Sequence, residues 1–219
     1  MKPPFPIFVD LNGRPCVVIG GGEVAARKVR SLRDAGARVT VIAPEASAAM
    51  QKLLDDPAVR LEARAYRPGD LADSALAFAA TDDSATNASV YAEATQLGIL
   101  INVVDDPAQC SFLVPSKVER GPVTIAISTQ GASPALARHL RERLEVAVPP
   151  AYGELAALLG RLRPEVKAAH ATPEQRARLW DAVVESDDVL NLLEQGKTVE
   201  AERETRRLLG LPPEEGGEV

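Results

Sequence analysis

Short apolar runs alternate with amphipathic stretches along the first half of the chain. Strands are predicted at residues 15–19, 38–42, 59–66, 75–80 and 99–104. Helical spacing follows the first strand and recurs before the last one, over 87–96. Continuous apolar strands separated by helices are typical of a parallel sheet that is covered on both faces. We therefore expect an α/β fold with a doubly wound parallel sheet in this part of the chain.

The pattern changes after Ser111, where two strands follow each other without a helix between them. They are predicted at 112–118 and 123–128, and the residues between them, 119–122, include Gly-Pro. Such a short turn favours an antiparallel pair.

The rest of the chain predicts helices. Ser133 and Pro134 are a favoured N-cap and first helical residue. On one face of that helix lie Leu136, Leu140 and Leu144. A later apolar stripe ends near Pro164, and Thr172 opens another helix. We predict an α/β domain over 1–112, a small central α+β segment over 113–148 and an all-helical domain over 149–219.

The composition excludes several classes of protein. Of the 219 residues, 46% are hydrophobic and 26% charged, which is too apolar for disorder and too mixed for a membrane protein. A net charge of -6 and an aromatic content of 4% argue against nucleic acid as a partner. The N-terminus has no apolar region of signal-peptide length, and the two cysteines form no CxxC motif. We expect a cytoplasmic protein without a membrane partner.

A glycine triplet after the first strand is the sharpest local signal. Gly20 to Ala25 fits the pattern G-x-G-x-x-A between a strand and a helix. Gly20 would permit the tight turn, and Gly22 would let the backbone approach a pyrophosphate at the helix N-terminus. A glycine-rich turn also occurs without a ligand, but this context favours a dinucleotide site.

The ends of three later strands carry candidate polar contacts. Glu45 follows the second strand, where an acid would bind the cofactor ribose, although Glu45 is alternatively a solvated turn residue. No arginine follows that would bind the 2′-phosphate of NADP, so NAD is favoured. Thr81 and Asp82 would lie beside the cofactor or cap the next helix. Asp105 would face the nicotinamide and is the better catalytic candidate, because Asp106 before a proline is typical of a turn.

A polar loop before the helix at Ser133 is the candidate substrate site. Ser128 and Thr129 lie in this loop, and Lys117 and Arg138 are among the basic residues that flank it. Cations beside a helix N-terminus would suit a polycarboxylate, although a capped helix with a solvated basic face explains them too. His139 and His170 share no metal-ligand spacing, so we predict no metal site.

Several motifs occur together in one order along nearly the whole chain. They are PIF at 6–8, GGGEVAARK at 20–28, AATDD at 79–83, NVVDDP at 102–107, SFLVPS at 111–116 and STQGASPALAR at 128–138. This set resembles the precorrin-2 dehydrogenase / sirohydrochlorin ferrochelatase family, the N-terminal module of siroheme synthases. Many relatives have two serines where this chain has Ser128-Thr129.

The resemblance implies a fold, a reaction and a set of site residues. It implies a Rossmann domain that binds NAD, a small central domain that dimerises by exchanging elements, and a helical C-terminal domain. The reaction would oxidise precorrin-2 to sirohydrochlorin, and some members then insert ferrous iron as a second substrate. Asp105 falls on the catalytic position, and Glu23, Val24, Pro44 and Glu45 fall on cofactor contacts. The alternative hypothesis is a non-catalytic dimeric module that senses NAD(H).

Overall fold

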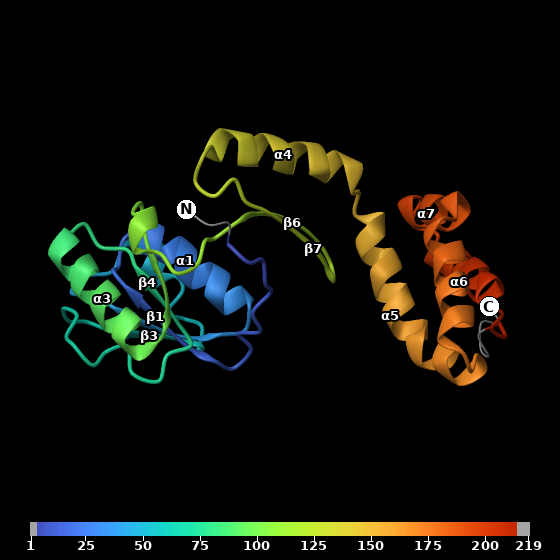
Figure 1. Cartoon of the computed structure of the whole chain (residues 1–219). Coiled ribbons are helices and arrows are strands. Elements are labelled where there is room, and N and C mark those ends of the chain that lie inside the picture. The colour runs from blue at the N-terminus through green and yellow to red at the C-terminus, as the bar shows by residue number, and fades with distance from the viewer. Residues whose placement is uncertain (1–3, 214–219) are drawn as a thin grey trace. The chain divides into compact units, whose positions relative to one another are not determined.

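The structure, a computed structural model, describes residues 4–213. By its internal contacts the chain divides into two compact units, Met1–Val114 and Pro115–Val219 (Figure 1). The division into three domains at 112 and 148 stays a prediction.

The first unit contains a five-stranded sheet in which every strand pair is parallel. Its strands are β1 (Pro15–Ile19), β2 (Arg38–Ile42), β3 (Val59–Glu62), β4 (Leu76–Ala79) and β5 (Leu100–Val103). Their order in the sheet is β3-β2-β1-β4-β5, so the predicted parallel sheet is confirmed. The order reverses between β1 and β4, and ligands of such sheets bind at the carboxyl ends of the strands at this switch point.

Helices cover both faces of this sheet, as Figure 1 shows for α1 and α3. The helices are α1 (Glu23–Asp34), α2 (Ala48–Gln51) and α3 (Ser84–Leu97), with a 3₁₀ turn, η1, at Pro107–Gln109. Successive side chains of β1 join opposite cores: Cys16 and Val18 pack with α1, whereas Val17 and Ile19 pack with α3. All four are buried, which explains why the strand has a continuous apolar sequence.

Cap residues determine where α3 begins and ends. The Asp83 carboxylate accepts hydrogen bonds from the backbone N–H groups of Ala85 and Thr86, so α3 starts three residues before the helix predicted at 87–96. Gly98, with φ +69°, ends the helix in the left-handed conformation that glycine favours.

The carboxyl ends of four strands are aligned. Ile19 is paired with both Ile42 of β2 and Ala79 of β4, and Ala79 is paired with Val103 of β5. The segments that follow these strands therefore meet at one edge of the sheet.

The second unit begins with an antiparallel hairpin, as predicted. Its strands are β6 (Ser116–Arg120) and β7 (Val123–Ile127). The strand predicted at 112–118 starts later because Phe112 belongs to the first unit's core, where its ring packs edge-on against Phe78 at 5.4 Å. An apolar run does not reveal whether it fills a core or pairs with a strand.

Five helices follow the hairpin in the described part of the second unit, up to residue 213. They are α4 (Pro134–Ala147), α5 (Ala151–Ala169), α6 (Pro173–Val184), α7 (Asp187–Glu194) and α8 (Thr198–Leu208). The predicted N-caps are confirmed: Ser133 Oγ accepts from the Leu136 N–H, and Thr172 Oγ1 accepts from the Gln175 N–H. The apolar stripe predicted to end near Pro164 lies on α5, which continues past this proline to Ala169.

Packing explains why α5 continues past its proline. Leu162 and Val166, on either side of Pro164, are both buried in the helical core of this unit. An interior proline costs about 3 kcal/mol, and burying two large apolar side chains offsets a cost of that size.

Two more features of the described residues bear on the sequence predictions. Among residues 4–213, the structure contains no helix with the length and apolarity needed to span a membrane. Cys16 and Cys110 are free thiols, and burial raises the pKa of Cys16 to about 11.

Candidate functional site

The glycine turn after β1 has two positions that only glycine can fill. A Cβ atom at Gly20, whose φ is +122°, would lie 2.3 Å from the Ala80 carbonyl oxygen. A Cβ atom at Gly21 would lie 1.9 Å from the Glu45 carbonyl oxygen. Both distances are far inside van der Waals contact, so the protein's own backbone excludes a side chain at these positions.

Gly22 differs from its two neighbours. Its φ of -77° is open to any residue, and a Cβ atom built there would meet nothing within 4 Å. Gly22 is also the N-cap of α1, and no side chain caps that helix end. A phosphate can bind where backbone N–H groups at a helix N-terminus face open space. The geometry at Gly22 therefore fits the predicted pyrophosphate contact.

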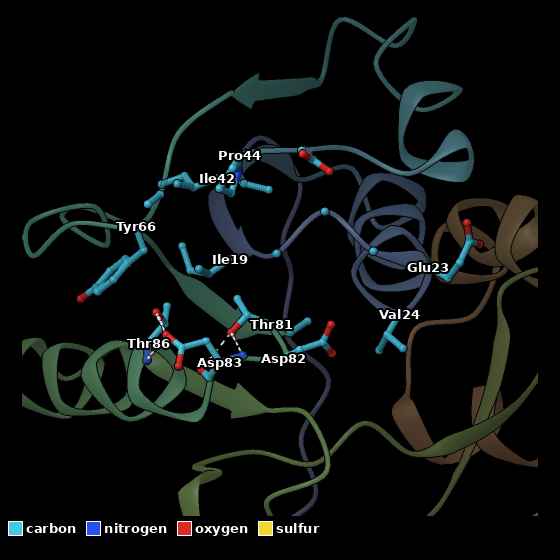
Figure 2. A pocket seen from close by; sticks show the side chains of 17 residues that line it. Ile19, Glu23, Val24, Ile42, Pro44, Tyr66, Thr81, Asp82, Asp83 and Thr86 are labelled. Carbon is cyan, nitrogen blue, oxygen red and sulfur yellow. Dashed lines mark hydrogen bonds between the residues drawn. The ribbon is translucent and has the colours of Figure 1, made fainter.

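A cavity of about 560 Å³ opens at this edge of the sheet, within the size range of small-molecule sites (Figure 2). It is lined by Ile19, Gly20, Gly21, Gly22, Glu23, Val24, Ile42, Ala43, Pro44, Glu45, Ala65, Tyr66, Ala80, Thr81, Asp82, Asp83 and Thr86. All eight residues predicted as cofactor contacts are among them. The structure thus brings the predicted residues together, and their contact with a cofactor remains a proposal.

The charges around the cavity have one sign. Its described lining contains four carboxylates, from Glu23, Glu45, Asp82 and Asp83, and neither lysine nor arginine. Hydrogen bonds from the Thr86 hydroxyl and from the backbone N–H groups of Thr86 and Ala85 lower the pKa of Asp83. Carboxylates would repel the 2′-phosphate of NADP, whereas a ribose hydroxyl can donate to them.

The capping interpretation of the segment after β4 is confirmed, at Asp83, and the cofactor contacts of Thr81 and Asp82 stay a prediction. Asp83 caps α3, and the Thr81 hydroxyl donates to Asn87 Oδ1 at 2.8 Å, which fixes the turn onto the helix. Asp82 has an exposed side chain beside the cavity. Figure 2 shows Asp82 and Val24 on the same side of the cavity, away from Tyr66.

Asp105 and Asp106, which follow β5, have different environments. Asp106 accepts hydrogen bonds from the Ala108 N–H at 3.1 Å and from Gln109 Nε2 at 2.6 Å, so the predicted turn role is confirmed. Asp105 is exposed and has φ +61°, a left-handed conformation that a non-glycine residue rarely adopts. Outliers of this kind cluster at functional sites.

Asp105 lies at the same edge of the sheet as the cavity. The Val104 N–H, immediately before it, donates to the Ala79 carbonyl at 2.9 Å and so joins the ends of β5 and β4. A molecule lying across the carboxyl ends of β1 and β4 would extend toward Asp105.

Lys28 of α1 is a neighbour of Asp105 that the sequence predictions did not include as a site residue. Its ammonium lies 5.4 Å from the centre of the Phe78 ring. Burial lowers the pKa of Lys28, Arg27 adds to this effect, and the charge of Asp105 opposes it. A cation is therefore close to the candidate catalytic carboxylate.

The predicted substrate residues lie in the second unit. Ser128 is exposed, and its Oγ accepts from the Gln130 N–H at 3.1 Å. Thr129 Oγ1 accepts from the Ser133 N–H at 3.3 Å and donates to the Ser133 carbonyl at 3.2 Å. A serine hydroxyl could make the same two bonds, so the threonine preserves the loop that the resemblance implies.

The basic residues near this loop have different partners. Lys117 is exposed and pairs with Glu119 at 2.8 Å, and Arg138 is exposed on α4. Arg120 instead donates to the carbonyls of Val148 and Glu145 near the C-terminus of α4, which gives it a structural role. Substrate binding by Ser128, Thr129, Lys117 and Arg138 stays a prediction.

Nine of the residues that line the cavity were not predicted as site residues, Gly21 and Tyr66 among them. Gly21 lacked a role because only the folded chain reveals the Glu45 carbonyl beside it. Tyr66 lies in the connection between β3 and β4, outside any motif. A tyrosine in a loop after a strand end was the available signal, and it is a weak one.

Three family models match successive parts of the chain. An NAD(P)-binding model matches residues 7–116, the model described as sirohaem biosynthesis protein central matches 120–147, and the sirohaem synthase dimerisation region matches 151–209.

Curated relatives carry the name siroheme synthase. The protein from Nitrosospira multiformis is 47% identical over 184 residues, which cover 82% of this chain and 39% of the relative. The protein from Stutzerimonas stutzeri is 42% identical over 215 residues, which cover 98% of this chain and 46% of the relative. The chain therefore spans less than half the length of these relatives.

Among solved structures, the chain is similar to SirC, described as a precorrin-2 dehydrogenase. The TM-score is 0.72 at 24% sequence identity, and the match covers 91% of this chain and 99% of SirC. At this identity the likeness supports the fold, including the parallel sheet followed by a helical region.

Proposed function

We propose that this chain, which belongs to the siroheme synthase family, oxidises precorrin-2 to sirohydrochlorin with NAD as the hydride acceptor. The observation that carries this proposal is the alignment of the glycine-turn cavity and Asp105 along one edge of the sheet. A cofactor in the cavity could present its nicotinamide ring toward Asp105. A substrate bound beside Asp105 would then contact both this ring and the Asp105 carboxylate.

The chemistry divides between the cofactor and the chain. Bound NAD supplies the acceptor for the hydride that leaves precorrin-2. The Asp105 carboxylate accepts the proton that the substrate loses in the same oxidation, for which a positioned general base is needed. The exposure of Asp105 supports this role because a macrocycle must reach it.

We rank dehydrogenation above iron insertion, the further reaction that some family members catalyse and that the assays below also measure. Among the described residues, no three His, Cys, Asp or Glu side chains lie where they could hold a metal ion together. One carboxylate supplies few of the ligands that ferrous iron, the second substrate of some family members, would need. The expected cytoplasmic location also stays a prediction.

The test is turnover by the purified protein. Incubation with enzymatically made precorrin-2 and NAD under anaerobic conditions should produce NADH and sirohydrochlorin in equal amounts, and NADP should support a slower reaction. A protein that binds NAD but leaves precorrin-2 unchanged would contradict the dehydrogenase and favour the alternative, an NAD(H)-sensing module.

We propose that the chain works as a homodimer. None of the residues of α4, all of which the structure describes, is buried, and Leu136 and Leu140 are 49% and 38% exposed. Apolar side chains in a row on a helix surface support a covering partner. The match of 151–209, which follow α4 in the chain, to a dimerisation region supports a second copy of this chain as that partner.

Sedimentation should therefore report about twice 23.3 kDa at micromolar concentration. Leu140→Glu should shift the protein toward the monomer, because a charge on the covered face would have to be buried on association. Glu142→Gln, an exposed change on the same helix, is the matched control. A monomeric wild-type protein would contradict the proposal.

A further inference from the structure

The sheet order fixes which end of the cofactor lies where. Asp105 follows β5, at one edge of the sheet, while the end of β2 and the connection after β3 line the other side of the cavity. If the reacting ring faces Asp105, the adenosine half extends toward β2 and the connection between β3 and β4. Residues 63–75, all of them described, make that connection without a helix.

Tyr66 in this connection is the aromatic residue among the described cavity lining. It packs against the apolar cluster that contains Ile19 and Ile42, the last residues of β1 and β2. Figure 2 shows the ring at the end of the cavity opposite Glu23, with its hydroxyl directed away from the glycine turn. A flat apolar surface is therefore available on the adenosine side.

Glu93 of α3 holds both the ring and the loop. One carboxylate oxygen accepts from the Tyr66 hydroxyl, and the other accepts from the Leu71 N–H at 3.0 Å. Burial and this hydrogen bond raise the pKa of Tyr66, so the phenol stays a donor at neutral pH. Without Glu93 the ring would lose the contact that fixes its direction.

A second set of bonds closes the loop independently. The Arg64 guanidinium binds both oxygens of Asp70, at 2.7 and 2.8 Å, and Asp70 also accepts from the Arg67 N–H at 2.7 Å. The backbone around Tyr66 is thus tied at both ends. An aromatic ring held in this way loses little conformational freedom on binding a ligand.

We propose that the Tyr66 ring is the surface against which the adenine of the cofactor packs, and that Glu93 is the residue that positions it. This inference rests on the proposed use of NAD and adds a specific contact for its non-reacting half.

The test compares two tyrosines of the same unit. Tyr66→Leu keeps an apolar side chain but removes the flat ring, and we expect the Kd for NAD and for ADP-ribose to rise about 5- to 100-fold, as when a base loses an aromatic neighbour. KM for NAD should rise with it while kcat stays near the wild-type value, because adenine takes no part in the reaction. Tyr91→Leu is the control, since Tyr91 packs on the same core outside the cavity lining.

Glu93 variants test the positioning role. In Glu93→Gln the amide oxygen can accept from Leu71 and the amide N–H can donate to the phenol oxygen, so NAD affinity should be kept. Glu93→Ala removes both contacts and should weaken NAD and ADP-ribose binding without lowering kcat. Loss of kcat in this variant would overturn the positioning role.

The outcomes separate this inference from the proposed function. Wild-type affinity in Tyr66→Leu, or an equal loss in Tyr91→Leu, overturns the adenine contact and leaves NAD as the cofactor. Failure of the wild-type protein to bind NAD or ADP-ribose overturns the use of NAD itself, and the inference with it.

Discussion

Asp105→Asn should bind NAD as the wild-type protein does and lose precorrin-2 dehydrogenase turnover by about 10²–10⁴-fold, the usual contribution of a general base. Asparagine is nearly isosteric with aspartate but cannot accept a proton as a base. It also tolerates the left-handed conformation at φ +61°, so the backbone should not move. Single-turnover production of NADH, with NAD affinity from calorimetry, measures the two effects separately.

The neighbouring residue provides the matched control. Asp106→Asn should cost much less activity, because an amide oxygen can still accept from the Ala108 N–H. Iron insertion should be assayed on the same proteins with sirohydrochlorin supplied directly, so that the first step is bypassed. If Asp105→Asn dehydrogenates at the wild-type rate, Asp105 is not the base.

Gly22→Val should reduce NAD affinity at least about 100-fold while leaving the fold intact. The branched side chain would occupy the space where the pyrophosphate approaches the backbone. The pyrophosphate would then lose hydrogen bonds from backbone N–H groups, and a hydrogen bond to a charged group contributes about 1.5–3 kcal/mol. The protein itself has room for it, since nothing lies within 4 Å of the added Cβ. Calorimetry should report the loss, and circular dichroism and thermal unfolding should match the wild type.

Gly21→Val is the comparison variant, because it should disturb the fold where Gly22→Val should not. Its Cβ would lie 1.9 Å from the Glu45 carbonyl, so this variant should unfold at lower temperature or fail to fold. Equal NAD affinity in Gly22→Val and the wild type would show that the pyrophosphate binds elsewhere.

The sheet was predictable from the sequence because its strands are buried on both faces. Val17 and Val18 point to opposite cores, and both cores demand apolar residues, which gives a continuous apolar run. The predicted ends of elements were wrong where one residue type occurs in two structural contexts. Phe112 extends the apolar run before β6, but its side chain fills the core of the first unit. A proline ends most helices, but Pro164 lies inside α5, between two buried residues.

The site was predictable as far as backbone conformation dictates residue type. Gly20 and Gly22 and the polar residues after the strands could be found because turns and strand ends restrict composition. Contacts between segments that are distant in the sequence could not be predicted. The approach of the Glu45 carbonyl to Gly21 and the bond from Tyr66 to Glu93 depend on the tertiary arrangement, and no local pattern encodes them.

Different evolutionary constraints act on the three consecutive glycines, Gly20, Gly21 and Gly22. Gly20 and Gly21 are required by the chain's own carbonyl groups, so selection for folding alone would retain them. At Gly22 no carbonyl of the chain excludes a side chain, so a bound ligand gives selection a reason to keep this position small. A descendant that lost its cofactor but kept its fold should drift first at the third position, which makes that position an indicator of cofactor loss among divergent copies.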